Sequence, residues 1–240
     1  MDRQFDQQLE KLKTRIIKMC SLVDEQVEFA VRSIDEENAD LAKIVIERDK
    51  KVDKYDVKIE KICQKIFALN QPVAMDLRLI MSALTINSNL ERIGDLAVNI
   101  AENFLIMKKK PDFISRTHFN AMSKLTKEMI RSAIDAFIEN NAKLAAKVIE
   151  MDNMLDKYDV ENHAILIDVM KENAANIEPA VALLVISREF ERLGDHATNI
   201  AEDVYFIVEA QLIKHKYEKY LFGDEPDDDD DKDTDTPQAG

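Results

Sequence analysis

Residues 91–102, ERIGDLAVNIAE, decide the fold, because nearly the same stretch returns as ERLGDHATNIAE at residues 191–202. Nine of the twelve positions are identical at an offset of 100 residues. Self-similarity at a fixed period is the sequence signature of a repeated structural unit. We therefore expect the chain to contain two copies of one unit, with this motif in each.

The two copies also share their upstream segments. Residues 38–47 match residues 141–150, and the pentapeptide DKYDV at 53–57 returns unchanged at 156–160. These matches have an offset of 103 residues instead of 100. The change of offset places an insertion or deletion between the second and third segments of each copy.

Apolar residues recur in both motif segments at alternating steps of four and three, which is the period of one face of a helix. The first stripe runs through Leu79, Ala83, Ile86, Leu90, Ile93, Ala97, Ile100 and Phe104. The second runs through Leu183, Ile186, Phe190, Leu193, Ala197, Ile200, Val204 and Ile207. Clusters of Pro and Asn divide the chain into six segments of about 25–35 residues, a length typical of helical bundles.

The sequence thus predicts an all-α fold of six long antiparallel helices. We expect two tandem homologous three-helix bundles with a pseudo-twofold internal repeat, at residues 1–110 and 111–222. Composition agrees with this, because 4 Gly and 5 Pro in 240 residues leave few tight turns for a β fold. Residues 223–240 form an acidic tail with too little apolar surface to fold, and we expect it to be disordered.

Charge and hydropathy limit the classes of partner. The net charge is −14, of which nine acids and one lysine in residues 224–240 contribute −8. An acidic protein is a poor ligand for nucleic acid or for anionic membranes. The longest apolar run, residues 180–186, is far shorter than the roughly 20 residues that span a bilayer, and the N-terminus lacks a secretory signal. We expect a cytoplasmic protein without direct membrane insertion, in which Cys20 and Cys63 are buried, reduced hydrophobes.

Acidic residues of the repeated motif are the first candidate for function. If Ile93 is the centre of the buried stripe, Glu91 and Asp95 lie at about 160° and 200° from it, on a strip facing outward. Glu191 and Asp195 repeat this strip. The preceding segment of each copy adds two aspartates one helical turn apart, at the edge of its own core stripe. These aspartates are Asp49, Asp53, Asp152 and Asp156.

Four carboxylates from two neighbouring helices would repel one another or raise their pKa values unless a cation neutralised them. Oxygen ligands of this kind suit Mg²⁺, Mn²⁺, Ca²⁺ or iron. A solvated acidic face is the alternative interpretation. Gly94 and Gly194 stand between the Glu and the Asp of each motif, although glycine costs about 1 kcal/mol inside a helix. Either another backbone approaches there or a bulky cluster needs the space.

At these residues the chain resembles the PhoU family of phosphate-uptake regulators. The resemblance covers residues 1 to about 215 and rests on the paired ERIGD and ERLGD stretches, each continued by NIAE. The metal signature of the family is an E(D)xxxD pair, and it is filled by acids throughout this chain. The resemblance implies iron or zinc clusters, with manganese or magnesium as alternatives, held by Asp49, Asp53, Glu91, Asp95, Asp152, Asp156, Glu191 and Asp195.

The function implied by the resemblance is regulation and not catalysis. PhoU-like proteins act between a phosphate ABC transporter, through its nucleotide-binding subunit, and a sensor histidine kinase that they restrain when phosphate is ample. We expect the chain to reach the inner face of the membrane only through such partners, and a homodimer remains open.

Two alternatives stand beside this hypothesis. A carboxylate-bridged di-iron oxidase normally uses Glu-x-x-His pairs that project into a bundle core, and this sequence has none. A metal-free helical scaffold with solvated acids is the other. Nucleophilic catalysis has no supporting motif, so we expect no enzyme activity.

Overall fold

The computed structural model describes residues 3–213, which form six long α-helices and no strand within that range. The helices are α1 (Arg3–Asp35), α2 (Ala39–Leu69), α3 (Ala74–Met107), α4 (Phe119–Glu139), α5 (Ala142–Glu172) and α6 (Ile177–Glu209). Two short 3-10 turns, η1 (Asp112–Arg116) and η2 (Ala174–Asn176), precede α4 and α6. The predicted all-α class with a repeated three-helix unit is confirmed. The acidic tail at 223–240 lies outside the described residues.

Helices α2 and α5 begin where an asparagine side chain can satisfy their free N–H groups. The Asn38 side chain accepts from the backbone N–H groups of Asp40 and Leu41, and Asn141 caps α5 by accepting from Leu144. These two caps are equivalent positions of the repeat. Pro179 lies in the first turn of α6, where its missing N–H removes no helical hydrogen bond.

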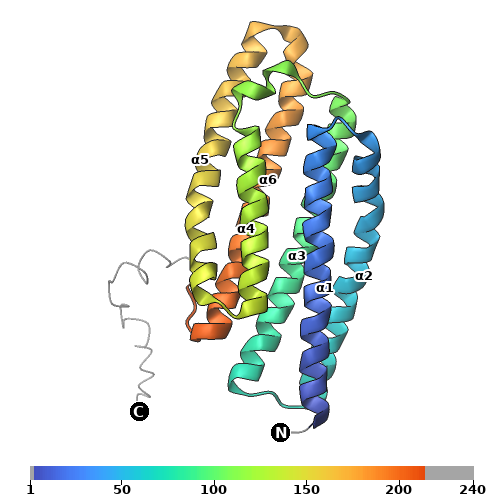
Figure 1. The fold of residues 1–240 in the computed structure, drawn as a ribbon, viewed down its shortest axis with the longest axis vertical. Helices are drawn as coiled ribbons and strands as arrows, with labels where there is room; N and C mark the ends of the chain where they lie inside the picture. The colour runs from blue at the N-terminus through green and yellow to red at the C-terminus, as the bar shows by residue number, and fades with distance from the viewer. Residues whose placement is uncertain (1–2, 214–240) are drawn as a thin grey trace, which may run out of the picture.

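The two three-helix bundles lie side by side, with α1–α3 forming one and α4–α6 the other (Figure 1). Helix α3 packs along α6 across the junction, and α1 also contacts α4. The buried residues form one core that includes both halves, from Phe104 in α3 to Phe190 in α6. The limit near residue 110 therefore separates two repeats that share a core.

Helices α3 and α6 occupy the centre of the molecule. Helix α3 is contacted by α1, α2 and α6, and α6 by α4, α5 and α3. A helix enclosed on three sides has little circumference left for solvent. The position of the repeated motif follows from this, because ERIGD and ERLGD lie midway along these two central helices.

Both cysteines are buried in the first bundle as free thiols, Cys20 at 2% and Cys63 at 0% exposure. Burial raises the pKa of each thiol to about 12. Their predicted role as small core hydrophobes is confirmed. Among the described residues, no helix is both long and apolar enough to cross a membrane.

Candidate metal platforms

A carboxylate from the second helix of each repeat lies directly over the glycine of the third helix. A Cβ atom added to Gly94 would be 3.2 Å from Oδ1 of Asp49, and one added to Gly194 would be 3.2 Å from Oδ1 of Asp152. No backbone atom is among the near neighbours at either position. At Gly94 this carboxylate is the nearest of the contacted atoms, whereas at Gly194 a methyl group of Leu155 would be closer than the carboxylate. The glycine therefore provides space for side chains of α2 or α5, the carboxylate among them.

We call Asp49, Asp53, Glu91 and Asp95 the first platform, and Asp152, Asp156, Glu191 and Asp195 the second platform. In the first platform, burial is the main cause that raises the pKa of Asp49 and of Glu91. The charge of Asp95 raises both pKa values further. The acids of α2 and α3 are thus close enough to repel one another across the helix–helix seam.

The carboxyl pKa values are raised further in the second platform than in the first. Burial, followed by the charges of Asp195 and Asp156, raises the pKa of Asp152 to about 7. Burial and the charge of Asp195 raise the pKa of Glu191 to about 7, although the Arg188 cation opposes the shift. Both carboxyl groups therefore titrate near neutral pH, where a bound cation would compete with protons.

Arginines act as counterions for two platform acids. In the first platform, Arg92 donates to Oδ2 of Asp95 at 3.1 Å. In the second, Arg188 donates to Oε1 of Glu191 at 2.7 Å. Arg192, the counterpart of Arg92, lies 3.5 Å from Glu189 on its own helix. Arg92 and Arg192 thus both pair with carboxylates on their own helix.

The platforms are not assembled as metal cages in this arrangement. Within residues 3–213, no three His, Cys, Asp or Glu side chains are already placed to hold an ion. Repulsion between the carboxylates and attraction to the arginines both keep the oxygens apart. The assignment of the eight acids as metal ligands stays a prediction.

Several features of the second platform nevertheless fit a cation. Oδ1 of Asp152 and Oε2 of Glu191 are buried oxygen atoms without a hydrogen-bond partner among residues 3–213. An orphaned buried carboxylate oxygen is costly unless a proton or a cation satisfies it. The donor set consists only of carboxylates, which are ligands for hard or borderline metals. Asp49, Asp53, Glu91 and Asp95 would supply the same donor chemistry in the first repeat.

The prediction that the motif acids of α3 and α6 face outward is wrong for Glu191, which is only 8% exposed. Glu91 and Asp95 are half-buried, and only Asp195 is exposed. The reason is that α5 and α2 cover these faces of the central helices, which a single helical wheel does not reveal. Asp49 and Asp152 do face a neighbouring helix, as expected from their place beside the core stripe, whereas Asp53 and Asp156 are exposed.

Sequence reasoning missed a fifth acid beside the four of each platform. Asp159, 6% exposed, accepts a hydrogen bond of 2.8 Å from Ser187, which in turn accepts from Asn162 at 3.1 Å. Its repeat counterpart Asp56 accepts from Asn87 at 2.5 Å. The signal was present, because both acids belong to the DKYDV pentapeptide that is identical in the two copies.

We call the space above Gly94 or Gly194, which Asp49 or Asp152 enters, the notch. The two platforms differ in the side chain of the first helix of each repeat that lies nearby. The buried side chain of Gln26 in α1 donates to Oδ1 of Asp49 at 3.0 Å. The repeat counterpart of Gln26 is Met129, whose methyl group lies 3.4 Å from a Cβ position on Gly194. The first platform thus has an amide donor from α1, and the equivalent residue of α4 is a thioether that cannot donate a hydrogen bond. No sequence signal marked this difference.

His196, next to the second motif, serves the junction between the repeats. Its Nδ1 lies 2.9 Å from Oδ1 of Asn89 in α3, and Asn199 donates to the same oxygen at 3.3 Å. Burial is the main cause that lowers the pKa of His196. This contact accounts for the histidine without a metal.

Comparison with known proteins agrees with this architecture. A family model of the PhoU domain matches residues 16–104 and 119–204, one stretch in each repeat. The chain is 37% identical to the phosphate-specific transport system accessory protein PhoU homolog of Aquifex aeolicus, over 88% of this chain and 96% of that protein. It is 31% identical to the accessory protein PhoU of Escherichia coli, over 93% and 95% of the two chains.

Solved structures give the same likeness. The crystal structure of PhoU from Pseudomonas aeruginosa superposes with a TM-score of 0.83 at 31% identity, covering 86% of this chain and all of that one. The phosphate transport system regulatory protein PhoU from Streptococcus pneumoniae gives 0.78 at 26% identity, over 87% and 98%.

Proposed function

Because the chain belongs to the PhoU family of phosphate-specific transport accessory proteins, we propose that it is a metal-binding negative regulator of phosphate uptake and of phosphate-starvation signalling. It couples a phosphate ABC transporter to a sensor histidine kinase from the cytoplasm. The family consists of accessory and regulatory proteins, so the expectation that the chain is not an enzyme is confirmed.

The observation that carries the metal proposal is the notch over Gly94 and Gly194. The same aspartate of the preceding helix approaches the glycine to the same distance, 3.2 Å, in both repeats. At Gly194 the packing of Leu155 also uses the space that the glycine leaves. At Gly94 the carboxylate of Asp49 is the nearest neighbour, and a solvated acidic face would not need a glycine beneath it, at a cost of about 1 kcal/mol. A platform that must hold four carboxylates around an ion gains from that space.

A bound cation would remove the repulsion between the carboxylates of each platform. It would also hold α2 against α3 in the first repeat and α5 against α6 in the second. The chain's own part is to present the oxygens of Asp49, Asp53, Glu91 and Asp95 in one repeat, and those of the second platform in the other. Arg92 and Arg188 would then be released from their present carboxylates. Two matched surfaces stabilised in this way suit an adaptor with two partners.

The metal proposal is tested with chelator-treated full-length protein titrated with Zn²⁺ and, under anaerobic conditions, with Fe²⁺. We expect binding at two classes of site, and a loss of affinity of roughly ten-fold or more in the double variant Glu91→Gln/Glu191→Gln. A matched control is Glu47→Gln/Glu209→Gln, which removes two exposed carboxylates outside the platforms. Equal affinities in both variants would reject the platforms, and no binding in the wild type would favour the metal-free scaffold.

The regulatory proposal has a separate test. We expect the tagged chain to co-purify with the nucleotide-binding subunit of the phosphate transporter and with the sensor kinase, and its deletion to switch on a phosphate-starvation reporter in ample phosphate. A silent reporter together with the absence of both partners would contradict it. Repeating the reporter assay with Glu91→Gln/Glu191→Gln separates the metal requirement from the regulatory role.

A further inference from the structure

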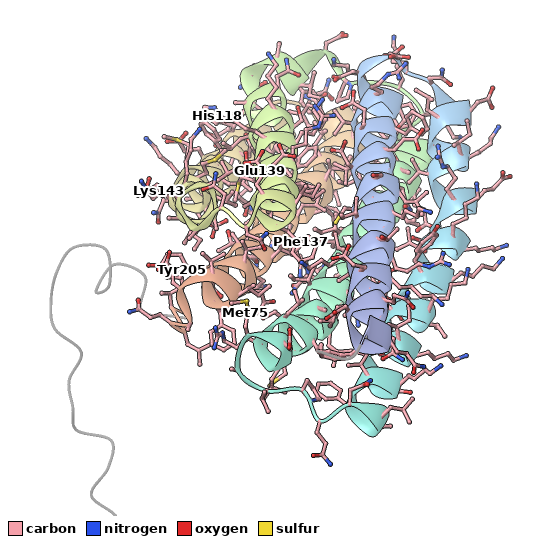
Figure 2. All side chains as sticks on the ribbon, turned by 60° about the horizontal axis from the view of Figure 1, so that its bottom comes forward. Met75, His118, Phe137, Glu139, Lys143 and Tyr205 are labelled. Carbon is pink, nitrogen blue, oxygen red and sulfur yellow. The ribbon has the colours of Figure 1, made fainter. Side chains whose placement is uncertain are left out.

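Cationic side chains line the groove between α1 and α2, although the protein as a whole is acidic. On α2 they are Lys51, Lys54, Lys58, Lys61 and Lys65, spaced alternately by three and four residues, so they occupy one helical face. On α1, Lys11, Arg15 and Lys18 are spaced by four and three. We call these eight residues the lysine groove. In Figure 2, nitrogen-tipped side chains project from the outer side of α2.

The groove has a definite shape. One hollow of about 450 Å³ is lined by Lys18 from α1 and by three lysines of α2, and a second of about 230 Å³ by Lys11, Lys61 and Lys65. Tyr55 lines the larger hollow, with the cations of Arg15 and Lys58 at 5.9 and 5.3 Å from its ring centroid. The two hollows follow one another along the same helix pair, so the cations form a continuous linear track.

The cations of this track have no acidic partner among the described residues. None of the eight makes an ion pair within residues 3–213, whereas most arginines and many lysines elsewhere in the bundle do. The one acid lining the larger hollow, Glu25, is paired with Arg48. Unpaired like charges along one face repel one another and leave a local positive potential.

The second repeat does not share this track. The positions of α5 equivalent to the five α2 lysines hold Met154, Lys157, Glu161, Ala164 and Asp168. The only lysine among them, Lys157, is already within 3.9 Å of Glu161. Core positions and platform acids are duplicated between the repeats, and the lysine groove is not. A feature confined to one repeat, at some cost in repulsion, needs a reason outside folding.

The chain itself contains a complementary segment. Residues 224–235 hold nine acids and one lysine, a net of −8 against the eight cations of the groove. Residues 227–233 in extended form would cover roughly 20 Å, and the helical rise from Lys51 to Lys65 is about 21 Å. The acidic segment and the lysine groove therefore match in charge and in length.

The end of α6 lies against α1, the helix that forms one side of the groove. Ile207 lines a hollow together with Leu9 and Glu10 of α1, on a different face of α1 from the one that carries Lys11. Figure 2 shows Tyr205 of α6 and Met75, which lines the same hollow, at the end of the bundle that faces the viewer. Ile213 is buried against the core. The eleven residues from there to Asp224 can reach roughly 36 Å.

We propose that residues 224–235 of the same chain dock in the lysine groove between α1 and α2 and cover it against other polyanions. Covalent attachment gives the segment an effective concentration in the millimolar range, which a free acidic partner in the cell must overcome. The groove is then an interaction surface that opens when a stronger acidic ligand displaces the segment. This inference does not depend on the metal or on the regulatory partners.

Zero-length carbodiimide cross-linking of the full-length protein tests the contact directly. We expect cross-links from the acids of 224–235 to Lys54, Lys58 and Lys61, within one molecule when ¹⁴N- and ¹⁵N-labelled proteins are mixed. Their yield should fall about five-fold or more in 0.5 M salt, where the Debye length is only about 4 Å. Cross-links spread evenly over all exposed lysines, or formed only between molecules, would overturn the proposal.

Charge reversal supplies a matched control. Lys54→Glu/Lys61→Glu should abolish the cross-links to the remaining groove lysines, whereas Lys124→Glu/Lys143→Glu should leave them unchanged. The control lysines are exposed, and Lys143 lies on α5, on the far side from α2 in Figure 2. Equal losses in both variants would mean that only net charge matters, which would overturn the proposal.

Binding to phosphatidylglycerol vesicles tests the alternative that the lysine groove takes a membrane surface and not residues 224–235. A chain truncated after Gly223 should bind such vesicles, or the free peptide of residues 224–240, at least ten-fold more tightly than the full-length chain, because its groove is uncovered. If the full-length chain binds the vesicles as tightly as the truncated one, the groove takes lipid and the proposed docking is wrong.

Discussion

Gly94 and Gly194 lower the helix propensity of α3 and α6 but leave space beside the platform carboxylates. An alanine at Gly94 would gain about 1 kcal/mol of helix propensity. Its Cβ would lie 3.2 Å from Oδ1 of Asp49 and 3.3 Å from Cγ1 of Val52, tighter than ordinary van der Waals contact. The gain in helix propensity would stabilise the protein and the crowding would destabilise it. Only the crowding would act on the Asp49 carboxylate.

We therefore expect Gly94→Ala to change the free energy of unfolding by less than about 1 kcal/mol, while it weakens Zn²⁺ binding at the first platform by roughly ten-fold. Urea unfolding in chelator and calorimetric titration with Zn²⁺ measure the two effects. Ser88→Ala, at an exposed position of α3, is the control for helix propensity. Unchanged Zn²⁺ affinity in Gly94→Ala would refute a role for the notch in binding.

The raised pKa values of the second platform make stability depend on pH. A carboxyl group whose folded pKa lies near 7, above its unfolded value near 4, contributes stability at low pH that is lost as the pH rises through about 7. Asp152 and Glu191 both behave in this way. In the absence of metal the second repeat should therefore lose stability between pH 5 and pH 8.

Replacing Asp152 by asparagine should reveal this penalty. At pH 5 the Asp152 carboxyl is already protonated, so we expect Asp152→Asn to be nearly neutral. At pH 8 the variant should be more stable than the wild type by on the order of 1 to 2 kcal/mol, after allowance for solvent screening. Urea unfolding in chelator at both pH values measures the difference. A gain of the same size at pH 5 would show that repulsion is not the cause.

Single residues were predictable from the sequence where the repeat duplicated a polar side chain. The eight platform acids and the two glycines were found in this way. The burial of Glu191 was not, because a helical wheel gives the direction of a side chain relative to its own helix and not the position of the next helix. Gln26 and Met129 carried no signal, since α1 and α4 differ at this position.

At the scale of the helices, the sequence was most informative about where each helix begins and ends. The Asn and Pro clusters mark the actual connections, because asparagine caps a helix start and proline interrupts the ladder of N–H donors. The short 3-10 turns η1 and η2 were not predicted, since three to five residues carry no measurable periodicity. Equivalent caps at Asn38 and Asn141 allow a comparison of the two repeats at this scale.

Removing these caps should cost about 1 kcal/mol each. We expect Asn38→Ala to be the more damaging, because its side chain accepts from two backbone N–H groups and Asn141 accepts from one. Asn153→Ala, at an exposed position inside α5, should instead be neutral or slightly stabilising, since alanine is the better helix former. Thermal or urea unfolding of the three variants gives the order, and equal stabilities of Asn38→Ala and Asn153→Ala would contradict it.

At the scale of the whole molecule, the two repeats meet through complementary charges that the repeat alone would not produce. Lys127 and Arg131 of α4 pair with Glu28 of α1 at 3.2 Å each, and Arg131 also pairs with Asp24 at 3.0 Å. At the repeat offset of 103, Asp24 corresponds to Lys127 and Glu28 to Arg131. Equivalent positions thus carry opposite charges, and each faces the other across the pseudo-twofold axis.

The docking of the two bundles could not be predicted, although their existence could. Apolar stripes show which faces are buried and leave the partner open, and two similar units could equally pair with a second copy of themselves. The charges at Asp24, Glu28, Lys127 and Arg131 favour the unlike pair, because a like pair would set acids against acids or bases against bases. This is a form of selection against the wrong association.

A full charge exchange tests this interpretation in the intact chain. Reversing only the α1 side, with Asp24→Lys/Glu28→Arg, should destabilise the protein by about 1 to 2 kcal/mol, because exposed pairs of this kind contribute less than about 1 kcal/mol each and repulsion replaces them. Reversing α4 as well, with Lys127→Asp/Arg131→Glu, should restore most of that loss. Urea unfolding at low and high salt measures both variants, and salt should narrow the gap between them. If the variant with all four substitutions is no more stable than the variant with only the α1 reversal, these charges do not select which bundles pair. The fit of the α3 and α6 side chains must then determine the pairing of the bundles alone.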